Sequence, residues 1–101
     1  MSKKSRIKAK EKRGITTVKV GMKHPMMSYD EAAKKGKKAN FITSMVATVD
    51  GKVVYEVSTS QFLSKNPFIQ FKFAGNNKGK KVVFTWKDLS GASRTDSKKI
   101  K

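Results

Sequence analysis

The chain of 101 residues contains no cysteine and only one histidine. The missing thiols exclude a disulfide, a thiolate metal site and any sulfur group carried on the chain itself. Acidic residues are also scarce, because seven Asp and Glu stand against 24 Lys and Arg, for a formal net charge of +17. This excess favours acidic or polyanionic partners through long-range attraction, and it does not decide the fold.

Long apolar runs are missing as well. No stretch approaches the roughly 20 apolar residues of a membrane-spanning helix. The basic start of the sequence is not followed by the apolar run of a secretory signal, so we expect no signal peptide in the chain as written. The length fits one domain, predicted over residues 1–101, with residues 1–5 as a disordered basic leader.

Alternation of apolar and polar residues is the dominant pattern in this sequence. The alternating segments are 17–23, 41–49, 53–57, 69–73 and 82–87, with shorter strands expected near Ile7 and over 94–100. About seven strands separated by turn residues predict an all-β protein, an immunoglobulin-like antiparallel β-sandwich.

Two glycine-containing segments predict turns. Asp50-Gly51 lies between two alternating segments, which is a strong signal for a β-hairpin. The run from Gly75 to Lys81 superficially resembles a phosphate-binding loop, but no Ser or Thr follows the lysine and the next segment is strand-like. We therefore predict a solvated hairpin turn there.

The segment from His24 to Asn40 has no strand period and is long for a connection within a small domain. Residues 29–38 begin with acids and end with lysines, which suits a single helical turn.

Few side chains suggest chemistry. His24 lies among several methionines that could in principle hold a cuprous ion, but methionine at strand spacing is more often core or interface filler. Glu56 and Asp88 are predicted to be solvated charges on strand surfaces. No nucleophile, base and orienting group converge, so we predict no enzymatic activity, no metal and no cofactor.

A basic nucleic-acid-binding β-domain is the alternative that composition alone supports, because lysine clusters neutralise phosphates and exposed aromatic residues stack on bases. The aromatic residues weaken it: Phe71, Phe73, Phe84 and Trp86 alternate with polar residues, as an inward core face does. Lysine also greatly outnumbers arginine, which favours a general positive field over bidentate phosphate recognition.

Several motifs, in a fixed order, resemble the SoxZ family of the bacterial thiosulfate-oxidation system. They are His24-Pro25-Met26, Asp50-Gly51-Lys52-Val53-Val54, Asn66-Pro67-Phe68 and Phe84-Thr85-Trp86-Lys87-Asp88. The resemblance extends from about Arg6 to Ile100.

The resemblance implies a noncatalytic, immunoglobulin-like subunit that pairs with SoxY, whose cysteine on a C-terminal arm carries sulfur intermediates. It also implies transient contact with sulfur-oxidation enzymes, and a periplasmic location reached by export together with the partner. Without that partner, uncovered strand edges could pair in a homodimer. Because methionine and aromatic residues favour desolvated interfaces, we hypothesise a partner-binding site at Met22, His24, Met26, Phe41 and Phe68.

Overall fold

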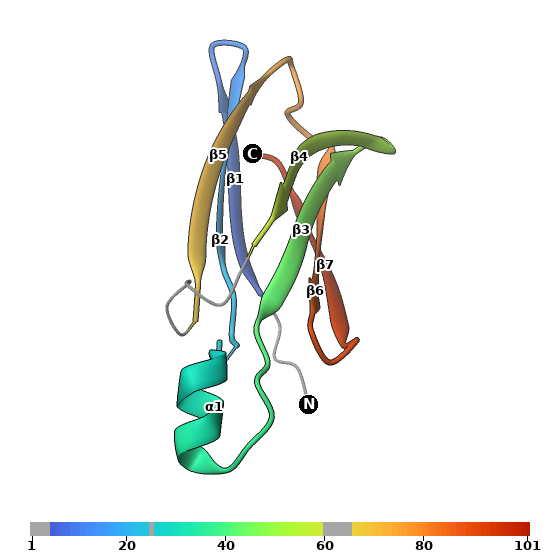
Figure 1. Ribbon diagram of the computed structural model, residues 1–101. Helices are drawn as coiled ribbons and strands as arrows, with labels where there is room; N and C mark the ends of the chain where they lie inside the picture. Colours follow the sequence, from blue (N-terminus) through green and yellow to red (C-terminus); the bar gives the residue numbers. More distant parts are fainter. Residues whose placement is uncertain (1–4, 25, 60–65) are drawn as a thin grey trace.

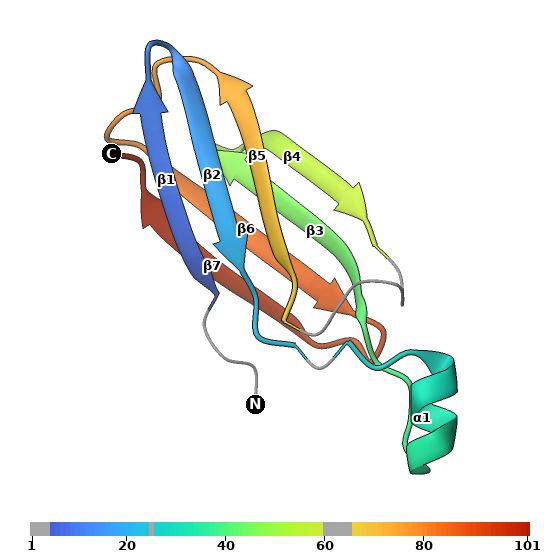
Figure 2. The same ribbon diagram turned by 90° about the vertical axis from the view of Figure 1, so that its left-hand side faces the viewer.

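Two antiparallel sheets face each other in the computed structural model, which describes residues 5–24, 26–59 and 66–101 (Figures 1 and 2). One sheet has the order β1 (Arg6–Lys12), β2 (Ile15–Gly21), β5 (Phe68–Ala74). The other has the order β4 (Lys52–Ser58), β3 (Ile42–Val49), β6 (Lys81–Asp88), β7 (Ser93–Lys99). The predicted seven-stranded sandwich is confirmed.

Alternating apolar residues from both sheets fill the space between them. Val18 and Val20 of β2 are fully buried, as are Phe84 and Trp86 of β6. Phe71 of β5 is buried as well. The period-two pattern of the sequence therefore identifies the inward face of each central strand.

The hairpin predicted at Asp50-Gly51 joins β3 to β4. Both residues have positive φ, 52° at Asp50 and 76° at Gly51, as expected for a two-residue turn that follows the twist of the strands. The pairing shifts register between Ala47 and Thr48, where Val54 is the extra residue, so a β-bulge lies in β4 just after the turn.

The start of β3 departs from strict alternation. Ile42 is fully buried, although the pattern assigns it to the opposite face from Met45 and Ala47. A register shift between Ile42 and Ser44 in the pairing with β6 explains the change, because an extra residue reverses the side to which the preceding side chains point.

The prediction of a hairpin turn at residues 75–81 is wrong. This segment connects β5 to β6, and these strands belong to different sheets, so it crosses from one layer of the sandwich to the other. Asn77 in its middle is buried, and its Nδ2 donates a hydrogen bond to Thr16 Oγ1 at 3.2 Å. Gly and Asn mark a change of chain direction equally well in both kinds of connection.

The long connection after β2 contains the helix α1 (Tyr29–Lys35), which projects beyond one end of the sandwich (Figure 1). The Ser28 hydroxyl accepts a hydrogen bond from the Glu31 amide, and Gly36 ends the helix in the left-handed conformation. The predicted helical turn is confirmed and extends to seven residues.

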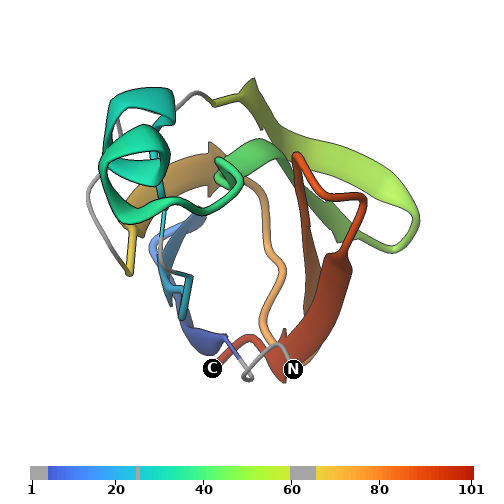
Figure 3. The same ribbon diagram turned by 60° about the horizontal axis from the view of Figure 1, so that its bottom comes forward.

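The chain closes on itself along β1. The Lys101 amide donates to the Ala9 carbonyl at 3.1 Å, and the Glu11 amide donates to the Lys101 carbonyl at 2.8 Å. Figure 3 shows the C-terminus beside β1. The Ser5 amide donates to Asp96 of β7, so Ser5 has a defined place, whereas the rest of the predicted leader, residues 1–4, lies outside the described residues.

Candidate partner-binding site

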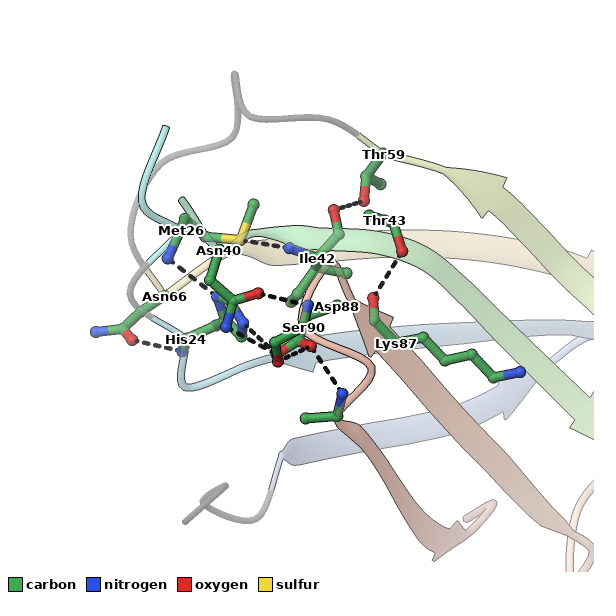
Figure 4. A network of polar contacts seen from close by, with 11 residues as sticks. His24, Met26, Asn40, Ile42, Thr43, Thr59, Asn66, Lys87, Asp88 and Ser90 are labelled. Atoms are coloured by element: carbon green, nitrogen blue, oxygen red, sulfur yellow. Dashed lines mark hydrogen bonds and ion pairs between the residues drawn. The ribbon is translucent and has the colours of Figure 1, made fainter. Parts of the chain in front are cut away.

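The residues predicted to form a partner-binding site lie next to the end of β2 and the starts of β3 and β5, at the end of the sandwich that carries α1 (Figure 1); Figure 4 labels two of them, His24 and Met26. Met22 and His24 follow β2, Phe41 precedes β3, and Phe68 begins β5. The same end contains the last residue of β6, Asp88.

His24 is buried, and both of its ring nitrogens have partners. Nδ1 lies 3.0 Å from the Met26 amide nitrogen and accepts a hydrogen bond from it. The ring proton is therefore on Nε2, which donates a hydrogen bond to Asp88 Oδ2, also at 3.0 Å. The Trp86 ring meets the imidazole edge-on at 5.3 Å between centroids. The backbone of His24 is held by two further bonds, from its amide to Asn66 Oδ1 and from the Asn66 amide to its carbonyl.

Asp88 is the centre of this network, and the prediction that it is a solvated surface charge is wrong. It is only 8% exposed. Its carboxylate accepts hydrogen bonds from His24, from Asn40 Nδ2 at 3.1 Å, from the Ser90 hydroxyl at 2.7 Å and from the Ala92 amide at 2.9 Å. The sequence did not indicate this because two of the four donors, on His24 and Asn40, are more than 40 residues away.

Two opposing effects act on the pKa of Asp88. Burial raises it, because a charged carboxylate loses hydration. Hydrogen bonds from Ser90, His24, Asn40 and the Ala92 amide stabilise the ionised form and outweigh burial, so the pKa lies below its ordinary value of 3.8. Asp88 is therefore an ionised acceptor at neutral pH.

Of the methionines considered as soft metal ligands or interface filler, Met22, Met26 and Met45 are buried and Met27 is half-buried. Met22 and Met45 are at most 1% exposed, and the Met26 thioether accepts a hydrogen bond from the Ile42 amide at 3.2 Å. Within the described residues, no group of three or more His, Cys, Asp and Glu side chains is placed to hold a metal ion.

The geometry gives His24, Asp88 and Ser90 a structural function. The Ser90 hydroxyl donates to Asp88, and neither His24 nitrogen is left to take a proton from it. The network joins the long connection, the start of β3 and the turn after β6 at one point.

Four of the five predicted site residues are thus buried in the single chain, and Phe68 alone is mostly exposed, at 64%. Two further apolar side chains at this end are exposed: Tyr29, at 55%, and Leu89, at 45%. The Tyr29 ring meets Phe41 edge-on at 5.7 Å, and the Leu89 amide donates to the Phe41 carbonyl. We call Tyr29, Phe68 and Leu89 the apolar end patch.

Sequence reasoning missed Tyr29 and Leu89, because neither falls in an alternating segment. The aromatic residues considered for base stacking lie elsewhere: Phe71, Phe84 and Trp86 are buried and Phe73 is partly buried. These four therefore provide no exposed stacking surface.

Fold and site together define an all-β sandwich with a buried polar network at one end, which joins the long connection to the turn after β6. The chain belongs to the SoxZ family, since the family model described as sulphur oxidation protein SoxZ matches residues 4–99. The family is a noncatalytic component of the sulfur-oxidation system, and membership gives the chain a role in that system. No match was found among curated proteins. Across residues 5–24, 26–59 and 66–101, no helix is long and apolar enough to cross a membrane.

Proposed function

We propose that the chain is the noncatalytic subunit of a sulfur-carrier heterodimer and that it binds a SoxY-type protein. The partner's C-terminal-arm cysteine would carry the sulfur intermediates of thiosulfate oxidation, because this chain has no thiol of its own. We also propose that the pair works in the periplasm and is exported together. Family membership is the main support.

The apolar end patch is the observation that carries the proposal beyond the family. Three of the five exposed large hydrophobic side chains of the described residues lie at this one end of a strongly basic molecule. Exposed aromatic and large aliphatic side chains are enriched in the buried centre of protein interfaces. Phe41 is buried next to this surface, because its ring contacts Tyr29 and its carbonyl accepts a hydrogen bond from the Leu89 amide.

The test is light scattering of the purified chain, alone and mixed with the SoxY-type protein of the same organism, near about 0.15 M salt. We expect a stable one-to-one complex. The chain measured alone also tests whether it forms a homodimer without its partner. Absence of a complex would contradict the proposed function.

A pair of variants locates the interface. We expect Phe68→Asp to weaken pairing by about tenfold or more, because a carboxylate would be buried without a partner in the complex. Val53→Asp is the control: Val53 is similarly exposed, at 58%, but lies next to the β3–β4 turn. Equal pairing by both variants and the unmodified chain would remove the end patch from the interface. Substitutions at His24 or Met26 are unsuitable, because those side chains are buried and would disturb the fold.

A further inference from the structure

The two outer faces of the sandwich differ sharply in charge. On the β1-β2-β5 sheet, the outward side chains include six cations: Arg6, Lys8, Lys10, Lys12, Lys19 and Lys72. We call this surface the basic face. Glu11, the one acidic residue in these three strands, belongs to the alternate set of β1 residues, which points inward with Ile7 and Ala9.

The outer face of the other sheet has a smaller positive excess, because Lys81, Lys87 and Lys99 lie toward its ends and Glu56 lies opposite Val46. Val46, Thr85 and Thr95 lie opposite one another across β3, β6 and β7, and the next row contains Thr48 and Val83. A net charge of +17 is therefore not spread evenly over the molecule. The basic face holds six of the 24 Lys and Arg residues and no outward-pointing acidic residue.

An open groove of about 1010 Å³ runs along β1 beside this face. Lysines at alternate positions of β1 line it, and Lys98 and Lys101 lie on its other side. Same-side residues of an extended strand recur every ~6.6 Å, so β1 presents a row of positive charges ~20 Å long. A row of this length can contact several residues of an extended peptide, and it is longer than a single small anion.

Part of this arrangement works against stability. Lys8 and Lys19 lie directly opposite each other in the β1–β2 pairing, and like charges in such a pair are destabilising. Acidic residues elsewhere are used to balance cations, as in the Arg94–Asp96 pair at 3.1 Å and the Lys80–Asp50 pair at 3.1 Å. On the basic face no carboxylate does so among the described residues.

We propose that the basic face and its groove bind an extended acidic segment of a partner protein. Lysine ammonium groups are compact point charges, which suits separate carboxylates along a chain. The groove lining contains no aromatic side chain on which a nucleic-acid base could stack, which disfavours single-stranded nucleic acid. This binding is separate from the pairing proposed for the apolar end patch.

The experiment uses the whole chain and a fluorescein-labelled peptide of about ten glutamates, with binding followed by fluorescence anisotropy at about 0.05 M salt. The K8E/K10E/K12E variant changes the groove. The K34E/K37E/K38E variant makes the same change in net charge on the exposed α1 region and is the matched control. We expect the first variant to weaken binding by about tenfold or more and the control by less than about twofold.

The thermal midpoint of the K8E/K10E/K12E variant should stay equal or rise, because Lys8→Glu places a carboxylate opposite Lys19 and so replaces a repulsive pair with an attractive one. Equal weakening by both variants would show that net charge alone attracts the peptide and would overturn the proposal. So would tighter binding of a ten-nucleotide oligothymidylate that is lost in the same variant.

Pairing of the K8E/K10E/K12E variant with the SoxY-type protein, measured by light scattering, should be unchanged. Intact pairing without glutamate-peptide binding would overturn this inference alone. Peptide binding without pairing would overturn the proposed function alone.

Discussion

Asp88 illustrates how one residue can join distant parts of this chain. Its carboxylate accepts hydrogen bonds from His24, Asn40, Ser90 and the Ala92 amide, and it therefore fixes the connection that carries α1 to the end of β6 (Figure 4). A buried acceptor with several donors is costly to remove, because each donor then loses its partner without regaining water.

We expect Asp88→Ala to lower the free energy of unfolding by about 2–4 kcal/mol. Asp88→Asn should cost less, since its amide oxygen still accepts some of these bonds. Urea unfolding followed by tryptophan fluorescence reports the change, because Trp86 lies against His24. A loss below about 0.5 kcal/mol for Asp88→Ala would show that the network contributes little to stability.

The lowered pKa of Asp88 also predicts how stability depends on pH. Because the folded pKa lies below 3.8, the unfolded chain binds more protons in acid. The stabilisation is fully present above the unfolded value and is lost as pH falls through the folded one. The urea midpoint of the unmodified chain should therefore drop steeply below about pH 4, and Asp88→Asn should reduce that slope.

Asp96 is a second carboxylate that contributes to this pH dependence. Burial raises its pKa, but hydrogen bonds from Arg94 and from Ser5 bring it below 3.8, so it contributes in the same direction. The double variant D88N/D96N should show the weakest acid dependence. An unchanged slope in both variants would rule out these two carboxylates as its source.

At the scale of the elements, the β3–β4 hairpin depends on backbone geometry that few residues adopt. Gly51 has a φ of +76°, and no atom lies within 4 Å of a Cβ added there. The destabilisation caused by a larger residue at this position would therefore come from backbone strain alone. Left-handed geometry is unfavourable for residues with a Cβ.

Gly51→Ala should lower the free energy of unfolding by about 1–2 kcal/mol, measured by urea unfolding. Gly21→Ala is the control, because Gly21 lacks a positive φ and its added Cβ would make an ordinary contact with Phe68 at 3.9 Å. That variant should be nearly neutral. Comparable losses in both would argue against backbone strain as the cause.

The elements also show what the sequence can and cannot predict here. Strands and the Asp50-Gly51 hairpin follow from period-two alternation and a local turn signal, both of which are short-range. The crossing at residues 75–81 was mistaken for a hairpin because local residues do not say which sheet the next strand joins. The burial of Asp88 was missed for the same reason, since Asn40 and His24 approach it only in the folded chain.

At the scale of the whole molecule, different surfaces suit different partners. The apolar end patch suits a tightly packed subunit, whereas the basic face suits a salt-sensitive, charge-driven contact. The two surfaces meet at one end of the β1-β2-β5 sheet, where Arg6 and Phe68 lie on either side of Gly21.

Ile100 tests how much the closure along β1 matters to the whole fold. It is only 1% exposed, and its amide donates to the Lys80 carbonyl. Ile100→Ala should lower the free energy of unfolding by about 2–4 kcal/mol, because it leaves a cavity between the sheets. Ile15→Ala, at a 44% exposed position, is the control and should cost much less.

The bonds between Lys101 and β1 join the two ends of the sequence. Bringing together residues so far apart in the sequence costs much chain entropy before the contacts compensate for it. Proteins with many such long-range pairings fold slowly. During synthesis, β1 leaves the ribosome long before its closing partner exists. The pairing of residue 101 with β1 can therefore form only after residue 101 has left the ribosome.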